Sequence, residues 1–595
     1  MKLKFCSCAE KLYNVIFNQH ILMRIISTLS VLGIISIATT PIGFDTIDFV
    51  TKINTVNYLL GGLIIMSLLS IIRRFATFNS DAYLLAVSVA CYGLSLAFRN
   101  RHIYFIFGLL LFISIVGYYL MRDDKLNLTG MKFSVKKAVI VVSAAAAFFV
   151  IYVGGLTTLR YLNYSTSTYD MGIFSQMFYY MKETMLPNTT CERSELLSHF
   201  AVHLSPMFYV LLPGYFIFSS PVYLQIMQAL VVASAVIPLF LIARRHKLSY
   251  KVIAVICISF CFHPGLGGSC FYDIHENMFL APLVLWLLYF TDNKQWKFAY
   301  IFALLTCLVK EDAALYVACI ALYLFFSKKE FKHGITLFSF CVTYFLLAIS
   351  YLNNFGDGAM IGRYGNFISN QEWGLLSAVR TVILNPAYLI TEVFVQEKIL
   401  YMLIMLLPLA FLPLLNRNLS QLLLLIPFLV VNLLSDYPYQ HSIYFQYNFG
   451  TLAFFYYLAI LNIPHLGKSF KKYGITFMAA ASVILFISQL GGYTDNIKTY
   501  ISKHDNTKQI NMALEAIPED ATVRASGFFV PKLSSRKVIY DIQYSENVEE
   551  AVNAEYIVID IAEGHANKIA EEYKNRGYET VEHKKGLYWI LKRND

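Results

Sequence analysis

The sequence predicts an all-α polytopic membrane protein of about 13 to 15 transmembrane helices, with a small α/β domain at its C-terminal end. Two observations support this fold class. Of 595 residues, 57% are hydrophobic and only 14% are charged, whereas a soluble domain has about 25% charged residues. So much apolar surface cannot be hidden in an ordinary core, so lipid must act as its solvent. From residue 491 onward the composition becomes charged and alternating, which indicates a separate soluble part.

The predicted spans follow one another along the chain up to residue 490. A spanning helix needs roughly 20 apolar residues, and polytopic cores accept shorter or broken helices. The basic start M-K-L-K precedes the first run without a clear small-residue cleavage site, so we predict an uncleaved first helix. The runs lie at residues 21–41, 57–72, 83–97, 102–121, 138–157, 222–243, 252–262, 277–291, 298–309, 313–327, 334–352, 399–415, 419–434, 446–463 and 474–490.

Basic residues in the short connecting segments predict the orientation of these spans. The net charge is +10, but Lys and Arg cluster between apolar runs, so they indicate membrane topology and not nucleic-acid binding. We therefore predict a multi-pass plasma-membrane protein with a cytoplasmic N-terminus and an extracytoplasmic C-terminal domain. The strongest clusters, all placed inside by this orientation, are at 73–74, 122–125, 136–137, 244–247, 328–329 and 468–472.

The same orientation places the polar clusters that interrupt or flank the apolar runs on one side, the outside. Scattered structural polar residues would appear at both faces of the membrane, so this convergence predicts a functional site at the outer face. The clusters are Tyr169 with Asp170, His199 with His203, His263, D-I-H-E at 273–276, K-E-D at 310–312, Arg363, and D-Y-P-Y-Q-H at 436–441.

The stretch T-Y-D-M-G-I-F-S-Q, residues 168–176, lies near the start of the long outer segment 158–221, directly after the apolar run 138–157. Asp170 is placed where a spanning helix has just emerged, which suits a general base or a carboxylate that orients an acceptor. An ordinary loop aspartate that caps a helix starting at Gly172 would have the same spacing. The pattern alone leaves both interpretations open.

The second half of this outer segment contains an apolar stretch and two histidines. The stretch 204–220 holds Pro206 and Pro213, so we expect an interfacial or re-entrant helix in preference to a full span. His199 and His203 are four residues apart and would share one face of a helix. No third ligand is apparent and H-E-x-x-H is absent, so we predict a hydrogen-bonding role for His203 and no metal site.

Two further polar groups lie close to the membrane. His275 and Glu276 belong to D-I-H-E, which follows the flexible turn G-L-G-G. Lys310, Glu311 and Asp312 divide an apolar stretch. Charge at that depth is costly unless it lines a wet cavity or is paired, so a structural ion pair and a functional site are both consistent with the pattern.

The C-terminal part reads as a small α/β domain. We predict helices near 506–516 and 565–576, and a hairpin over 578–592 that turns near Lys585 and Gly586. Short strands fit 521–525, 537–542 and 556–560. The domain holds no phosphate-binding loop, nucleotide fingerprint or metal-ligand spacing.

The order of the motifs Y-D-M-G-I-F-S-Q, H-L-S-P, H-E-N, K-E-D and Q-H-S-I-Y-F-Q resembles the domain-of-unknown-function 2079 family of predicted membrane proteins, over about residues 150–560. That family in turn resembles the GT-C glycosyltransferases, polytopic enzymes that use lipid-phosphate sugars at the outer face. Their hallmark is an acidic residue in the first large outer loop, and Asp170 occupies that place here. This sequence departs from the pattern because it lacks a paired acidic motif in that loop and has four extra helices first.

The resemblance implies a GT-C-like core, with the protein divided into accessory helices (1–130), the core (131–495) and the outer α/β domain (496–595). It implies transfer of a hexosyl or pentosyl group from a polyprenyl-phosphate sugar to an extracytoplasmic glycan, lipid or protein acceptor. Asp170 would be the catalytic base and the sugar would invert. The substrate-binding residues it suggests are Arg160, Tyr169, Gln176, His203, His275, Glu276, Lys310, Glu311, Asp312, Arg363 and His441.

Two other functions remain compatible with the sequence. A transporter or flippase of a lipid-linked saccharide would show internal repeats and polar residues along a path, and the sequence shows neither. A non-catalytic scaffold would keep the fold and bind a partner through its outer domain. No cofactor is indicated, although carboxylates near histidines would permit a divalent metal.

Overall fold

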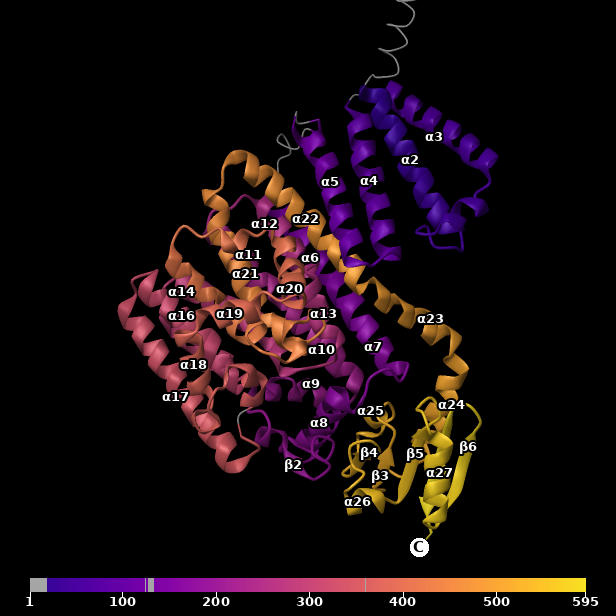
Figure 1. The fold of residues 1–595 in the computed structure, drawn as a ribbon, viewed down its shortest axis with the longest axis vertical. Coiled ribbons are helices and arrows are strands. Elements are labelled where there is room, and N and C mark those ends of the chain that lie inside the picture. Colours follow the sequence, from indigo (N-terminus) through magenta and orange to yellow (C-terminus); the bar gives the residue numbers. More distant parts are fainter. Residues whose placement is uncertain (1–18, 77, 123–124, 127–132, 359, 595) are drawn as a thin grey trace, which may run out of the picture. The chain divides into compact units, whose positions relative to one another are not determined.

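The computed structural model describes residues 19–594, apart from residues 77, 123–124, 127–132 and 359, and Figure 1 shows its ribbon. Two compact units are present. One comprises the described residues up to Lys137 together with 466–492, and the other comprises 138–465 together with 493–594.

The first unit is a group of five helices. Helix α2 packs against α3 and α4, and α22 packs against α4 and α5, so a helix from the sequence range predicted for the core associates with the N-terminal helices. Buried Asp81, in the first turn of α4, is paired with Arg24 of α2 and Arg73 of α3 and contacts the His20 ring, because a lone carboxylate would be too costly there. The helices are α2 (Gln19–Thr39), α3 (Thr55–Phe75), α4 (Ser80–Arg99), α5 (Ile103–Arg122) and α22 (Lys468–Leu490).

Long apolar helices of the second unit continue the membrane part. Among the described residues of the whole chain, nine helices are long and apolar enough to cross a membrane, which confirms the all-α polytopic fold. In the second unit they are α6 (Val135–Phe149) continued by the π-turn η2 (Val150–Gly154) and α7 (Gly155–Leu162), α10 (Pro221–Ser234) with α11 (Val236–Arg245), α12 (Tyr250–Cys261) with α13 (Pro264–Phe271), and α17 (Phe331–Phe355).

The other predicted spans of the second unit form shorter helical segments. A 13-residue helix is about 20 Å long, less than the roughly 30 Å of a bilayer's hydrocarbon core, so these segments account for the difference between nine long helices and the predicted number. Helix α21 is buried along its entire length, and α16 lies beside α17 (Figure 1). The segments are α14 (Leu280–Asp292), α15 (Trp296–Cys307), α16 (Ala314–Phe326), α20 (Gln396–Leu406), the 3-10 turn η12 (Leu419–Leu425), the π-turn η13 (Phe428–Leu433) and α21 (Phe449–Asn462). Helices α18 (Leu375–Leu384) and α19 (Pro386–Val393) lie outside the predicted spans.

The outer segment of the sequence folds into short elements. The π-turn η3 (Thr168–Gly172) leads into α8 (Ile173–Thr184), and β1 (Asn188–Thr189) pairs antiparallel with β2 (Leu197–Ser198). The apolar stretch 204–220 forms a 3-10 turn and the six-residue helix α9 (Leu212–Ile217). A helix of this length, about 9 Å, cannot span a membrane, so the re-entrant or interfacial alternative is the one compatible with the structure.

The C-terminal domain has the predicted α/β organisation. Its five-stranded sheet has the order β4-β3-β5-β7-β6, with β4, β3 and β5 parallel and β7 antiparallel to both β5 and β6. Gly586 has φ +80° in the hairpin turn, a conformation that glycine adopts without strain. The elements are α23 (Asp495–Ser502), α24 (His504–Glu515), β3 (Val523–Ala525), α25 (Val530–Leu533), β4 (Ile539–Asp541), α26 (Glu549–Val552), β5 (Tyr556–Asp560), α27 (Ala566–Asn575), β6 (Tyr578–Lys584) and β7 (Tyr588–Arg593).

Candidate functional site

Asp170 lies in η3, one turn before α8. Helix α8 has no side-chain cap at its first residues. Asp170 therefore does not cap this helix, which was the alternative role that the sequence left open. Its carboxylate is half-buried, and within the described residues no side chain or backbone amide forms a hydrogen bond with it. A carboxylate in this situation keeps both oxygens available to a substrate.

The surroundings of Asp170 adjust its acidity. Burial is the largest influence, followed by the negative charges of Glu276 and Glu192, and together these raise the pKa of the Asp170 carboxyl to about 7. Lys310 and His199 lower it to a smaller extent. An acid whose pKa is near neutral can exchange a proton with a substrate at physiological pH.

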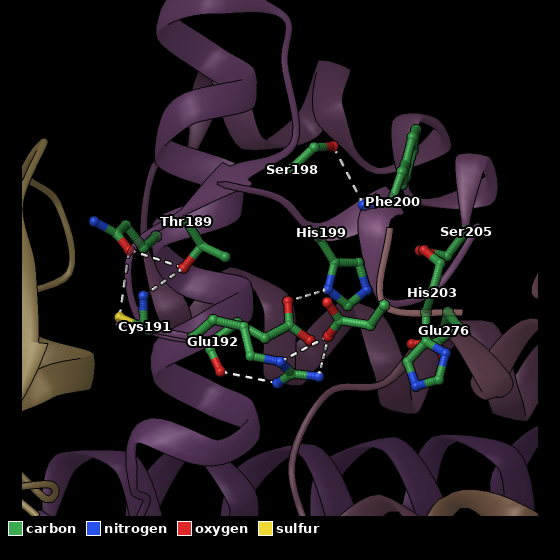
Figure 2. Close-up of polar contacts among 12 residues, drawn as sticks. Thr189, Cys191, Glu192, Ser198, His199, Phe200, His203, Ser205 and Glu276 are labelled. Atoms are coloured by element: carbon green, nitrogen blue, oxygen red, sulfur yellow. Dashed lines mark hydrogen bonds and ion pairs between the residues drawn. The ribbon is translucent and has the colours of Figure 1, made fainter. Parts of the chain in front are cut away.

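Beside Asp170 lies a buried ionic cluster built from three segments. His199 Nδ1 is 2.8 Å from a carboxylate oxygen of Glu192, across the loop that joins β1 to β2. Figure 2 shows the His199 ring turned toward Glu192, with His203 and Glu276 in the same region. His203 Nδ1 is 2.9 Å from Glu311, so the outer segment is bound to the turn between α15 and α16.

Glu276 is the acidic centre of this cluster and is fully buried. One of its oxygens is 3.0 Å from His275 Nδ1 and the other is 3.2 Å from Lys310 Nζ. Burial opposes the ionisation of Glu276, but His275 and Lys310 outweigh it and hold the pKa of the Glu276 carboxyl well below its usual range. Burial likewise disfavours the charged ammonium of Lys310, yet Glu276, Asp312 and Glu311 raise its pKa. The two groups therefore form an ionised pair in the protein interior.

Glu192 and Glu311 are ionised for similar reasons. Burial raises their pKa values, but His199 beside Glu192 and His203 beside Glu311 more than compensate, so both carboxyl pKa values lie below the usual range. These carboxylates are engaged with their partners, whereas Asp170 is not. Of Asp170, Glu192, Glu276 and Glu311, Asp170 is the one suited to accept a proton.

Arg363, in the 3-10 segment η8 (Ile361–Phe367), is a cation that contacts aromatic rings and, in the part of the chain that the structure describes, no carboxylate. Its guanidinium lies 5.0 Å from the ring centroid of Tyr437 and 5.4 Å from that of Tyr447, both within range of cation–π attraction. No acidic side chain of the described residues forms an ion pair with it. The negative charge of Asp170 acts on the same two tyrosines, so Asp170 lies within electrostatic range of the rings that contact Arg363.

An apolar cavity of about 510 Å³ adjoins the K-E-D turn. Asp312 and Tyr364 are its polar lining residues apart from a cysteine, and the remainder is almost entirely hydrocarbon. Its walls are formed by α16, α17, α18, η8 and η13, through Ala314, Leu315, Ala318, Phe338, Cys341, Val342, Phe345, Phe367, Leu375, Ala378, Val379, Val382, Ile383, Val430, Val431 and Leu434.

The structure also places Arg160, Gln176 and His441 outside the ionic cluster. Arg160 donates to Asp273 at 3.3 Å and to the Phe271 carbonyl, so it supports the turn after α13. Gln176 is engaged with the Thr189 and Thr190 hydroxyls and with carbonyls of the α/β domain. His441 has Glu397, an exposed residue, 3.9 Å away.

Several residues of this site are absent from the sequence-based set. Glu192 lies in C-E-R-S-E beside the equally acidic Glu195, and only its position seven residues before His199 could have indicated a pairing. Tyr437 belongs to the predicted polar cluster at 436–441 but is not distinguished within it, and Tyr447 stands in a tyrosine-rich stretch without a distinguishing local pattern. For a metal, the described part of the chain offers no group of three or more His, Cys, Asp or Glu side chains in a ligating arrangement.

The fold and this site define a multi-pass membrane protein with a paired ionic cluster next to a free carboxylate. The family model of predicted membrane proteins designated DUF2079 matches residues 160–589. The chain therefore belongs to the DUF2079 family, as the motif order predicts.

Comparison with solved structures gives 11 similar chains, and among them are two structures of one protein. One is ArnT from Cupriavidus metallidurans bound to undecaprenyl phosphate, with 11% identity, a TM-score of 0.48, and coverage of 77% of this chain and 98% of that chain. The other is the same ArnT in the apo state, with 10% identity, a TM-score of 0.43, and coverage of 75% and 98%. Comparison with curated proteins gives no match.

Proposed function

We propose that this protein is a GT-C-type membrane glycosyltransferase that moves a sugar from a polyprenyl-phosphate donor to an acceptor hydroxyl at the outer face of the membrane. The observation that carries the proposal is that a free carboxylate, Asp170, lies within electrostatic range of two tyrosines whose rings contact the Arg363 guanidinium, and that Arg363 has no acidic partner among the described residues. A base for the acceptor and a cation for the donor phosphate are the two groups such a transfer needs.

In the proposed reaction, Asp170 takes the proton of the acceptor hydroxyl as its oxygen attacks the anomeric carbon. The new bond between this oxygen and the anomeric carbon forms as the bond to the phosphate oxygen breaks. The bonding electron pair leaves with the polyprenyl phosphate, and attack from the opposite side inverts the anomeric configuration. The leaving phosphate is already stable as an anion, so it requires a cation and no general acid.

The donor has a matching place on the protein. Arg363 would hold the phosphate, because a guanidinium binds phosphate through paired hydrogen bonds. The adjacent apolar cavity, whose polar end carries Asp312 and Tyr364, would take the first units of the isoprenoid chain. Its volume of about 510 Å³ lies within the usual range of ligand pockets.

The ionic cluster would act on Asp170 from a distance. Lys310 is bound to Glu276, and His203 to Glu311, so their proposed role is to hold the outer segment and set the electric field at Asp170. Arg160 and Gln176 would likewise position the neighbouring turns, and His275 and His441 would orient substrate hydroxyls. The orientation proposed from the basic segments places this site and the α/β domain outside the cell.

The proposal is tested by the mass profile of envelope glycans and membrane lipids in cells that lack the gene. We expect one sugar modification to disappear and the corresponding polyprenyl-phosphate sugar to accumulate, with both changes reversed by the wild-type gene. If the protein were a flippase, its loss would instead leave the lipid-linked sugar on the cytoplasmic leaflet. Unchanged glycans and lipids in the deletion strain would contradict both the transferase and the flippase function, and the non-catalytic scaffold function would remain.

The transfer rate is expected to fall as the pH falls through about 7. Asp170 must be ionised to accept a proton, and burial, Glu276 and Glu192 raise the pKa of its carboxyl to about 7. Below that pH the group is protonated and inactive, and above it the base form predominates. The measurement is kcat/KM against pH with membranes that contain the protein. A midpoint near 4, the usual carboxyl value, would contradict the raised pKa of the Asp170 carboxyl.

Arg363→Gln is expected to raise the KM for the lipid donor by about 10- to 100-fold, because a charge-assisted hydrogen bond contributes about 1.5–3 kcal/mol. The KM for the acceptor should change little. Arg380→Gln is the matched control, since Arg380 also lies over an aromatic ring, that of Trp373, but on α18. An equal effect of the two substitutions would remove Arg363 from the donor site.

A further inference from the structure

The turn that carries Asp170 is attached to the α/β domain. The Thr168 hydroxyl donates to the carboxylate of Asp541, at the end of β4. Gly172 passes so close to α25 that a Cβ at this position would lie 2.9 Å from a methyl carbon of Val530. Contacts on both sides of Asp170 therefore fix its turn against the carboxyl end of the parallel strands, the usual place for ligands in such sheets.

The residue between these contacts, Tyr169, meets an aromatic side chain of the domain. Its ring and that of Tyr544, in the turn after β4, are 4.6 Å apart between centroids at an interplanar angle of 75°. Tyr544 is 54% exposed and Tyr169 is half-buried. The two rings thus lie edge to face with much of the Tyr544 ring accessible, and Tyr169 directly precedes the proposed base in the sequence.

The position of Tyr544 is also fixed from the outer segment. The Ser194 hydroxyl donates to the Tyr544 backbone carbonyl at 3.2 Å, and Ser194 lies in the β1–β2 loop that carries Glu192. A ring that is exposed yet anchored through its backbone loses little freedom when a ligand binds, which favours affinity. The exposed ring of Tyr544 is therefore a surface available to a ligand, on a residue whose backbone is fixed.

We infer that Tyr169 and Tyr544 form the acceptor subsite and that the acceptor is a saccharide, so the α/β domain contributes directly to the active site. This inference rests on the proposed transferase function. A sugar ring presents an apolar C–H face and a rim of hydroxyls, and tyrosine offers the matching aromatic face and a phenolic hydroxyl. Asp170 follows Tyr169 directly in the chain, so a saccharide bound at this pair of rings would lie next to the segment that carries the proposed base.

The test uses full-length protein in lauryldimethylamine oxide micelles, which carry no sugar. Saturation-transfer difference NMR with maltohexaose and with chitohexaose reports which sugar protons lie against the protein. We expect signals from ring C–H protons with the wild type and with Tyr544→Phe, and a dissociation constant raised roughly 3- to 10-fold in Tyr544→Ala. Val581→Ala is the control, since Val581 is 58% exposed on β6, at the opposite edge of the sheet from β4.

Two outcomes would overturn the inference: wild-type protein without sugar signals, or Tyr544→Ala that binds as the wild type does. Loss of binding in Tyr544→Phe as well would assign the effect to the hydroxyl and exclude ring stacking. The NMR readout requires no turnover, so it tests sugar binding independently of the transferase proposal. If sugar binding depends on Tyr544 but deletion of the gene leaves glycans and lipids unchanged, the transferase proposal fails while the sugar site remains.

Discussion

Asp170→Asn is expected to lower the rate of sugar transfer by about 10²- to 10⁴-fold, the usual contribution of a positioned base. Asparagine has nearly the same shape but cannot accept the acceptor proton. Neighbouring carboxylates cannot substitute, because Glu192 is paired with His199, and Glu276 with His275 and Lys310. The loss should appear in kcat, with the donor KM little changed.

The measurement compares transfer rates and cellular glycan profiles at matched protein levels in the membrane. Asp495→Asn is the control, since Asp495 is an exposed residue of α23 whose carboxylate pairs only with Lys498 among the described residues. We expect it to behave as the wild type. If Asp170→Asn keeps the wild-type rate while the gene deletion abolishes transfer, Asp170 has no part in the mechanism.

Lys310→Met is expected to destabilise the protein by about 3–5 kcal/mol, the typical cost of removing one partner of a buried ion pair. Lys310 and Glu276 are both almost completely buried and 3.2 Å apart. Methionine fills a similar volume, but it leaves the Glu276 carboxylate without the ammonium group that lies beside it. The measurement is the midpoint of thermal unfolding of the purified protein in detergent, together with its yield in membranes.

The double variant Lys310→Met with Glu276→Gln separates charge from packing. Removal of both charges leaves no uncompensated ion, and buried pairs replaced together are often neutral in stability. We therefore expect the double variant to regain much of the stability lost in Lys310→Met, as strong coupling in a double-mutant cycle. Additive losses would show that the pair is not coupled and that the cluster is held by other contacts.

The positions of the helices and strands could be predicted from the sequence because they follow from local patterns. All of the apolar runs became helical segments, and the hairpin turns at Gly586 as its turn signal predicts. The length and apolar content of a run predict the length of its helix less well where a proline interrupts the run. In the run 399–415, helix α20 ends before Pro408, because proline cannot donate a backbone hydrogen bond.

The candidate site was only partly predictable, since its members come from distant segments. Asp170, Lys310, Glu276 and His203 stand out because charged groups in apolar surroundings are rare. Their partners do not stand out, and Glu192 resembles any loop glutamate. The apolar cavity has no sequence signal at all, because each of its walls is an ordinary hydrophobic helix face.

By itself, then, the sequence determined the membrane class, the order of the elements, the family and the location of Asp170 after a spanning helix. The tertiary structure alone decided that Asp170 is a free carboxylate and not a helix cap, and that Arg363 faces Tyr437 and Tyr447. It also decided that Thr168 binds Asp541, 373 positions further along the chain. The physical reason is range: helix and strand formation depends on neighbouring residues, whereas the charge, burial and partners of a side chain depend on which distant surfaces pack against it.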